Sequence, residues 1–353
     1  MKLRMPAYCM DFACKGSDCG DNCCIGWEID IDDRTMDIYN SVRGAFGNAL
    51  REGIDLEKGC FRLNGERCPF LNKNNLCEII LNLGEDKLCH ICAEHPRYYE
   101  WFEGLCEGGI GMCCEEAARL ILQDNQPLKI WEREIPDEDC GEYDHELADY
   151  LFSCRETALE IVTDNSKSLG ERLSELLCFG EKLQQLIDND IYSAVAFDNP
   201  KSSETGNAAE ILTAFLDLEP IDEKWQPAVK EIISHLPKMR LEKAAFIAAN
   251  PLFIRSLENI AVYFIWRYFM KGAFDGEILS KLKLAVISVI VITLSAMEAW
   301  LKKGELSTED CVTAAKNYSK EVEYSEENLD MLADFCYENT AFSSKGLIAL
   351  LRE

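Results

Sequence analysis

The second half of the chain carries apolar residues at the spacing of helices that bury one face. Between residues 147 and 162, and again between 173 and 183, leucine, isoleucine, valine and alanine recur every three or four positions. This period places them on one side of an α-helix, where they pack against a core. The pattern predicts that residues 147–353 form a helical domain and that the protein is mainly α.

Local signals divide this half into separate helices. Residues 198–207 are rich in Asn, Ser and Gly and predict a loop, after which a new helix is expected over 208–218. Ser307 stands three residues before Asp310 in the arrangement of a capping box, with Asp in place of the usual Glu. Ser325 precedes two glutamates, which is typical of a helix N-cap. Helices are therefore expected to begin after both serines.

The first 122 residues have no such period and carry short, broken patterns. Brief alternations over 27–32 and 60–63 suggest short strands. The remainder of 1–122 predicts an irregular lobe held by metal. Residues 123–146 read as an acidic, exposed connection, because eight acids meet one arginine between 132 and 146 beside a proline and a glycine.

One uncharged run, residues 284–297, raises the question of membrane insertion. It holds fourteen largely apolar residues between Lys283 and Glu298. A bilayer-spanning helix needs about twenty, and runs of roughly 10 to 14 are usually buried helices. We therefore expect a core helix here and no membrane insertion.

The charge balance limits the class of partner. The chain has 36 basic and 63 acidic residues and a formal net charge of −27. Nucleic-acid binding depends on Lys and Arg contacts to phosphate, so a nucleic-acid partner is disfavoured. The acid excess favours a cationic partner or substrate, or else only keeps a helical protein soluble.

Cysteine is concentrated near the start of the chain. Thirteen of the 18 cysteines lie in the first 114 residues, and four form the opening cluster Cys14-x4-Cys19-x3-Cys23-Cys24. Thiolates are the ligands that iron-sulfur clusters and structural zinc require. The arrangement indicates a metal-binding lobe and is compatible with either kind of centre.

A disulfide framework is the competing interpretation of so many cysteines. Such frameworks hold together small secreted domains, whereas a chain of 353 residues can bury a large core. The first residues contain no apolar signal segment with a small-residue cleavage site. We therefore expect a reducing, cytoplasmic location and cysteines that bind metal.

Short sequence strings in both halves of the chain point to one family. The first half contains Pro6-x-Tyr8-x3-Phe12-x-Cys14-x-Gly16-x2-Cys19-x3-Cys23-Cys24-x-Gly26-Trp27, Cys68-Pro-Phe-Leu, Leu76-Cys77, Cys92-x2-His95-Pro-Arg97 and Cys114-x-Glu116. The second half contains Glu258-Asn-Ile-Ala-Val-Tyr-Phe-x2-Arg267, Asp275-Gly276 and Ser325-Glu-Glu-Asn-Leu329. Together they resemble the flagellin lysine N-methylase family, whose cysteine lobe is similar to zinc- or iron-chelating cysteine-cluster proteins.

This resemblance implies an enzyme that transfers methyl groups from S-adenosylmethionine to lysines of flagellin and carries a 4Fe-4S cluster, with zinc as the alternative metal. Carried over position by position, the implied metal ligands are Cys14, Cys19, Cys23, Cys24, Cys68, Cys77, Cys92 and Cys114. The other cysteines of the lobe fall outside the motif: Cys9, Cys60, Cys89, Cys106 and Cys113. His95 departs from the family, which has an aromatic residue there, and is either a neutral substitution or an extra ligand.

Methyl transfer to lysine requires a neutral amine. Deprotonating a group of pKa about 10.4 near pH 7 costs roughly 4 to 5 kcal/mol. A desolvated channel with a proton acceptor is therefore expected. The candidates for this channel are His95, Tyr98, Tyr99, Glu100 and Trp101. The alternative is that these side chains form only the hydrophobic shell of the metal site.

The methyl donor has no recognisable binding motif. Gly108-Gly109-x-Gly111 is better explained as flexible backbone beside the cysteines than as a nucleotide-binding loop. Two other functions therefore stay open. One is a metal-binding or electron-transfer module without methyl transfer, and the other is an adaptor whose helical part binds flagellin.

The remaining candidate residues lie in the helical half. His145 and His235 are expected at the surface, since one follows the acidic connection and the other precedes a proline. The aromatic run around Arg267 predicts a helix core, with a substrate-facing role as the alternative.

Overall fold

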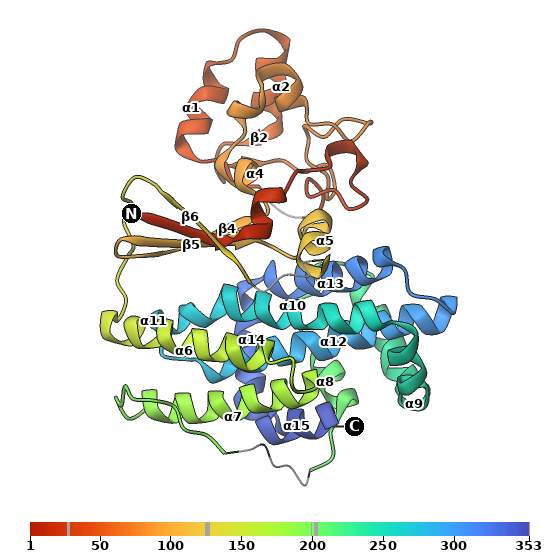
Figure 1. Ribbon diagram of the computed structural model, residues 1–353. Helices are drawn as coiled ribbons and strands as arrows, with labels where there is room; N and C mark the ends of the chain where they lie inside the picture. Colours follow the sequence, from red (N-terminus) through yellow and green to blue (C-terminus); the bar gives the residue numbers. More distant parts are fainter. Residues whose placement is uncertain (27–28, 124–127, 199, 201–203, 353) are drawn as a thin grey trace.

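The computed structural model describes residues 1–26, 29–123, 128–198, 200 and 204–352. The chain forms a lobe of short elements that stands on a larger helical domain, with a small sheet between them (Figure 1). Most of the described residues are helical, so the expected mainly α architecture is confirmed.

The helical domain consists of long helices packed side by side around one hydrophobic core. The helices nearest the lobe are α6 (His145–Thr163), α10 (Pro251–Tyr268) and α13 (Thr308–Glu323), and α12 (Leu279–Lys303) lies beneath α10. The others are α7 (Leu169–Ile187), α8 (Ala208–Ala214), α9 (Trp225–Ala249), α11 (Gly272–Asp275), α14 (Glu326–Glu338) and α15 (Ser344–Arg352). The apolar positions that recur in the sequence face this core.

Helix starts follow the signals in the sequence. The Ser307 hydroxyl accepts a hydrogen bond from the Asp310 N–H, and the Asp310 carboxylate accepts one from the Ser307 N–H, so the capping box before α13 is confirmed. Ser325 caps α14 through the N–H of Asn328. Helix α8 begins where the sequence predicts, although it ends earlier, at Ala214. Part of the predicted loop before it lies outside the described residues.

The uncharged run 284–297 forms the centre of α12. In the described part of the chain, α12 is the one helix long and apolar enough to cross a membrane by length and composition, and 67% of its most apolar stretch is buried inside the protein. Helices α7, α9, α10 and α13 pack against it. The prediction of a core helix is therefore confirmed.

The sheet joins the N-terminus to later parts of the chain. Its strands are β1 (Lys2–Pro6), β4 (Arg97–Phe102), β5 (Leu105–Ile110) and β6 (Ile130–Glu134), in the order β4-β5-β1-β6. Strand β1 is parallel to β5 and antiparallel to β6, and β4 and β5 form a hairpin. The sequence patterns do not predict this sheet, because β6 lies inside the acidic connection and β1 pairs only with distant residues.

The outer part of the lobe consists of short elements around a small core that includes Tyr39 and Phe61. The elements are α1 (Asp33–Ser41), α2 (Gly44–Gly53), β2 (Ile54–Asp55), β3 (Cys60–Phe61), α3 (Glu78–Leu83) and α4 (His90–Glu94). Strand β3 falls within the strand predicted over 60–63. Of the strand predicted over 27–32, residues 27 and 28 lie outside the described residues, and Asp30 forms an isolated bridge with Cys60.

A buried ion pair fixes the sheet to the helical domain. Glu107 of β5 accepts two hydrogen bonds from the Arg155 guanidinium of α6, at 2.5 and 2.7 Å. Arg155 also lies 4.5 Å from the ring centroid of Trp266, whose indole N–H donates to the carbonyl of Gly108 at 3.0 Å. Either charge alone would be costly to bury, so the pair locks β5 against α6 and α10.

Candidate metal centre

A cavity of about 480 Å³ lies between the cysteine lobe and the helical domain. Ten cysteines line it: Cys14, Cys19, Cys23, Cys24, Cys68, Cys77, Cys89, Cys92, Cys113 and Cys114. All eight cysteines implied as metal ligands are among them, although they are spread from residue 14 to residue 114. The fold therefore brings the predicted ligand set to one place.

The five cysteines outside the family motif divide into two kinds. Cys9 and Cys106 are buried in the small core formed by β1, β5 and α5 (Glu115–Gln123), and Cys60 is buried in β3. Cys89 and Cys113 line the cavity instead. The sequence around Cys89 and Cys113 contains no signal that distinguishes them from the three buried cysteines.

Backbone amides surround the sulfur atoms. The N–H groups at the start of α5 donate to the Cys114 sulfur, and those of Phe70 and Leu71 donate to the Cys68 sulfur. The N–H of Gly16 donates to the Cys14 sulfur at 3.4 Å. Such N–H donors stabilise negative charge on sulfur, as the outer shell of a metal site does.

The thiols in the cavity are crowded. Burial raises the pKa of Cys68 and of Cys114 to about 11. For Cys23 and Cys92, a hydrogen bond with a neighbouring cysteine and then burial raise the pKa further. These thiols are therefore protonated at neutral pH, and a cation placed among them would favour the thiolate form. A metal ion is one such cation.

The cavity cysteines form two neighbouring groups that Cys24 joins, because it interacts with both Cys23 and Cys92. The charges of Cys19, Cys23 and Cys114 act on one another. The second group comes from the segment 68–92, and its member Cys92 also interacts with Cys24. The members are Cys68, Cys77, Cys89 and Cys92. The opening loop thus supplies sulfur to both groups.

His95 also lines the cavity, with its ring 6.4 Å from that of Tyr324. Burial lowers the pKa of His95 to about 4, so the imidazole is neutral near pH 7. Tyr324, just after α13, and Lys320, in its last turn, line the cavity as well. These two residues were not predicted from the sequence, and they bring the helical domain to the cysteines.

The other four channel candidates, Tyr98 to Trp101, lie on β4 and do not line the cavity. Tyr98 is partly buried, and the guanidinium of Arg267 lies 4.5 Å from its ring centroid. A Cβ atom at Gly109 would lie 2.3 Å from the Tyr98 hydroxyl. The glycine in β5 therefore makes room for a tyrosine ring, which explains it without a nucleotide.

The next three candidates are held by other partners. The Tyr99 hydroxyl donates to Glu94 at 2.9 Å, and its ring lies 6.1 Å from that of Trp101. Glu100 pairs with Lys271 at 3.3 Å. Among the described residues that line the cavity, none of these three candidates is found, and Tyr98 is also absent. Of the five channel candidates, all of them described residues, only His95 lines the cavity.

A second buried ion pair lies between α10 and α13, next to the segment that carries Cys113. Arg267 of α10 and Glu323 of α13 are 2.5 Å apart, and the Tyr263 hydroxyl donates to Glu323 at 2.7 Å. The same hydroxyl accepts a hydrogen bond from the backbone N–H of Met112 at 3.0 Å. The pair therefore fixes the segment that leads to Cys113. The aromatic run around Arg267 is mostly buried, as expected for a helix core.

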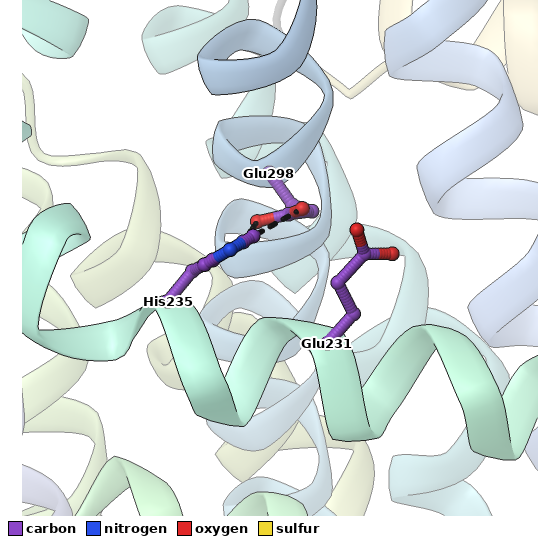
Figure 2. A group of neighbouring side chains, drawn as sticks. All are labelled: Glu231, His235 and Glu298. Carbon is purple, nitrogen blue, oxygen red and sulfur yellow. Dashed lines mark hydrogen bonds and ion pairs between the residues drawn. The ribbon is translucent and has the colours of Figure 1, made fainter.

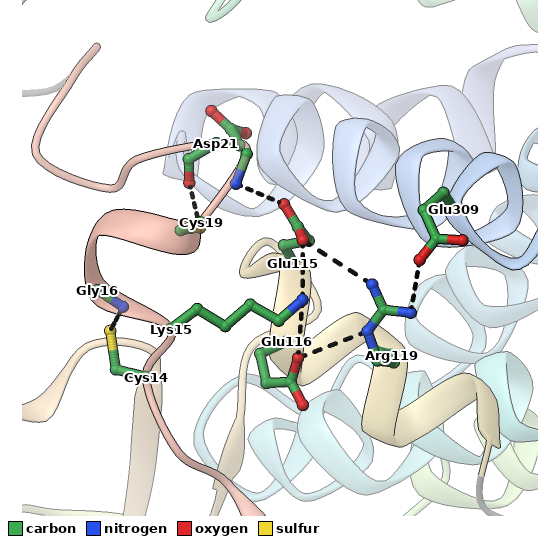
Figure 3. A network of polar contacts seen from close by, with 10 residues as sticks. Cys14, Lys15, Gly16, Cys19, Asp21, Glu115, Glu116, Arg119 and Glu309 are labelled. Carbon is green, nitrogen blue, oxygen red and sulfur yellow. Dashed lines mark hydrogen bonds and ion pairs between the residues drawn. The ribbon is translucent and has the colours of Figure 1, made fainter. Parts of the chain in front are cut away.

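Charged side chains fasten the opening cysteine loop to α5 and α13 (Figure 3). Lys15 lies 3.0 Å from Glu115 and 3.2 Å from Glu116. Arg119 pairs with Glu116 at 3.5 Å and with Glu309 of α13 at 3.0 Å. One network therefore links the loop that carries Cys14 and Cys19 to both helices.

Asp21 adds a direct contact between this loop and α13. Its carboxylate lies 2.6 Å from the Lys316 ammonium and 3.4 Å from that of Lys320. Burial alone raises the pKa of Asp21, but the two ammonium groups outweigh it and hold the pKa below its usual value. The carboxylate is therefore charged at neutral pH and paired across the domain boundary.

Comparison with known proteins defines the class. Residues 155–350 match the family described as the FliB lysine N-methylase C-terminal domain. Since this match covers more than half of the chain, the protein belongs to the flagellin lysine N-methylase family. The matched part contains α13 and Tyr324, which form one side of the cysteine cavity.

Three relatives show similarity over part of the chain. The flagellar biosynthetic protein FliU of Salmonella muenchen is 29% identical over 137 residues, which are 36% of this chain and 81% of FliU. The lysine-N-methylases of Salmonella choleraesuis and Salmonella typhimurium are 30% and 29% identical over 139 residues, or 37% of this chain. The match spans 35% of the length of each lysine-N-methylase. No solved structure matches the chain.

Proposed function

We propose that this protein transfers methyl groups from S-adenosylmethionine to lysine side chains of flagellin, and that the cavity cysteines bind an iron-sulfur cluster which this activity requires. One observation carries the proposal. The cysteines converge on a cavity whose other side belongs to the lysine N-methylase domain, through Lys320 and Tyr324. The candidate metal ligands and the family domain thus share one site.

The spacing of the sulfur atoms supports a cluster over a single zinc ion. Within the described residues, no three cysteine sulfurs lie within 4.8 Å of one another. Four thiolates around one zinc, each about 2.3 Å from the metal, are about 4 Å apart. A cluster holds its cysteine ligands further apart, because irons and sulfides lie between them.

The proposed ligands of a 4Fe-4S cluster come from the eight family positions, and Cys89 and Cys113 are available beside them. When bound, such a cluster supplies a metal centre that can take further ligands and pass single electrons. The chain itself supplies the thiolates, the N–H donors around them and the ionic network that holds the opening loop. We place the reaction in the cytoplasm, where thiols stay reduced.

The cavity also suits the need for a neutral lysine amine. Its lining includes the apolar residues Phe12, Leu71 and Leu88, which would desolvate an incoming amine. Lys320 in the same wall is already paired with Asp21, so desolvation is the effect that favours the neutral amine. It lowers the pKa of a substrate lysine, whose proton leaves to solvent as the amine enters.

Methyl transfer then exchanges one bond for another. The amine nitrogen of the substrate forms a bond to the methyl carbon while the bond from that carbon to the sulfonium sulfur breaks, and S-adenosylhomocysteine leaves. His95, which burial keeps neutral, can accept a hydrogen bond from the entering amine without repelling it. A volume of about 480 Å³ is within the range of small-molecule sites, so the cavity has room for part of the donor.

The net charge supports a lysine-bearing partner. A chain with a formal charge of −27 attracts a cationic segment and speeds its encounter. This attraction acts at long range, so we expect the rate to fall as added salt screens it. A salt-independent rate would remove charge steering from the proposal.

The test is methyl transfer by cluster-loaded protein. Chain purified without oxygen, with its iron and sulfide measured, is incubated with flagellin and S-adenosylmethionine. We expect mass spectrometry to find lysine peptides of flagellin heavier by one or more methyl groups. Unmodified flagellin together with full iron content would favour a metal-binding module without methyl transfer. Binding of flagellin without modification would favour an adaptor.

A further inference from the structure

A second group of metal-ligating side chains lies in the helical domain, between α9 and α12 (Figure 2). Glu231 and His235 are one turn apart on α9, and Glu298 faces them from α12. One ligand atom from each residue lies within 4.8 Å of the other two. The His235 Nδ1 atom is 2.9 and 3.0 Å from the two carboxylate oxygens of Glu298.

We propose that Glu231, His235 and Glu298 bind a divalent first-row metal ion that joins α9 to α12. One imidazole and two carboxylates suit Zn²⁺, Fe²⁺ or Mn²⁺. The three residues come from two helices that pack directly, so folding of the helical domain brings the ligands together before any ion arrives. Nothing in this site depends on the cysteines of the lobe.

The burial pattern fits an ion that keeps some water. The Glu298 side chain is 7% exposed, whereas Glu231 and His235 are about 43% and 42% exposed. Glu231 and Glu298 also line a cavity of about 330 Å³. The ion would therefore have protein ligands on one side and solvent on the other.

The Lys302 ammonium occupies part of the proposed metal position. Its ammonium lies 2.7 Å from Glu231 and 3.2 Å from Glu298. A single ammonium leaves one negative charge of the two carboxylates unmatched, while a divalent ion matches both. Lys302 is 48% exposed on a flexible stem, so it can swing into water when an ion binds. Lys302 is therefore a competitor of the metal.

The position of the site suggests what the ion does. Pro237 lies inside α9, two residues after His235, and lacks the N–H that would complete the helical hydrogen bond. A metal bridge through His235 would hold this weakened part of α9 against the core helix α12. The ion would then stabilise the helical domain.

Mn²⁺ is the probe, because it prefers oxygen and imidazole ligands over the thiolates of the cysteine cavity. Full-length protein is titrated with Mn²⁺, and the free ion is followed by electron paramagnetic resonance. We expect one saturable site per chain and a raised melting temperature. His235→Ala should weaken binding at least tenfold, with unchanged iron content and circular dichroism.

Lys302→Met separates a metal site from a simple ion-pair network. If the ion competes with Lys302, this change should tighten Mn²⁺ binding several-fold, although the metal-free variant is less stable. Cys92→Ala serves as the control and should leave Mn²⁺ binding unaltered. No saturable binding, equal binding by the His235→Ala variant, or weaker binding by Lys302→Met would each overturn the proposal.

Discussion

The carboxylate of Asp21 lies 2.6 Å from the ammonium of Lys316, although 295 residues separate them in the sequence. Asp21 sits between Cys19 and Cys23, and Lys316 belongs to α13 of the helical domain. Only 11% of the Lys316 side chain and 29% of the Asp21 side chain are exposed, so the pair is partly shielded from water. This contact ties the position of two cavity cysteines to the family-matched domain.

Replacing Asp21 with Asn should loosen the opening cysteine loop. The change removes the charge that pairs with Lys316 and Lys320, and groups that orient metal ligands affect metal affinity by about tenfold or more. We expect iron to be lost to a chelator about ten times faster, while circular dichroism of the helices is unchanged. Asp18→Asn, an exposed position in the same loop, is the matched control. Equal iron loss from both variants would contradict a positioning role for Asp21.

Removing one partner of the buried pair Arg267 and Glu323 should be costly. The Glu323 side chain has no exposed area, so Glu323→Gln leaves the guanidinium without its counter-charge. Loss of one partner of a buried pair costs about 3 kcal/mol or more. Urea unfolding should show this loss in the free energy of unfolding. A change below about 1 kcal/mol would mean that the tyrosines around Arg267 stabilise its charge on their own.

Among the channel candidates after Cys92, His95 should affect turnover, whereas Tyr99 and Trp101 should not. Because Tyr99 and Trp101 lie off the cavity, Tyr99→Phe and Trp101→Ala should change methyl transfer by less than about threefold, or about 0.7 kcal/mol. His95→Ala should lower methyl transfer at least tenfold with iron content unchanged. Turnover and iron are measured on the same preparations. A large loss of activity in Trp101→Ala with full iron content would instead show that Trp101 lines the substrate channel.

Glu321 predicts how stability depends on pH. Burial raises the pKa of its carboxyl to about 7, against the hydrogen bonds that it accepts from the backbone N–H groups of Ile221 and Asp222. The folded protein thus keeps a proton that the unfolded chain releases near pH 4.3. The free energy of unfolding should fall as pH rises from about 4.5 to 7, and this group should add no change above that range.

The pH prediction is checked by urea unfolding at pH 5.5 and 7.5. Glu321→Gln cannot ionise and is the comparison. We expect the wild-type protein to lose about 2 kcal/mol more than the variant between the two pH values. Parallel pH profiles would show that Glu321 is ionised in the folded state throughout.

The sequence predicts those parts of the fold that depend on local pattern. The helices after residue 147 and the cap at Ser307 follow from apolar spacing and capping chemistry, which act within a few residues. The sheet does not, because pairing of β1 with β5 and β6 connects residues more than a hundred positions apart and β6 carries an acidic sequence. Hydrophobic period alone gives no information on such pairing.

In the site, too, the residues with their own chemical signature are predictable from the sequence, and those placed by packing are not. Cysteine type and family position identified eight residues that line the cavity, since thiols carry their chemistry in the sequence itself. Lys320 and Tyr324 carried no such mark, because their role comes from the packing of α13 against the lobe. In the sequence, Glu298 is only the charge that ends an apolar run, and its contact with His235 forms when α9 and α12 pack together.

Iron and acid-labile sulfide per chain, measured on protein purified without oxygen, test the central claim most directly. The wild-type protein should contain both in equal amounts, and Cys23→Ala and Cys92→Ala, which alter the cavity, should lose most of each. Cys106→Ala, buried in β5 away from the cavity, should keep the wild-type content. One tightly bound zinc without sulfide, or equal iron in all three variants, would contradict an iron-sulfur centre in this cavity.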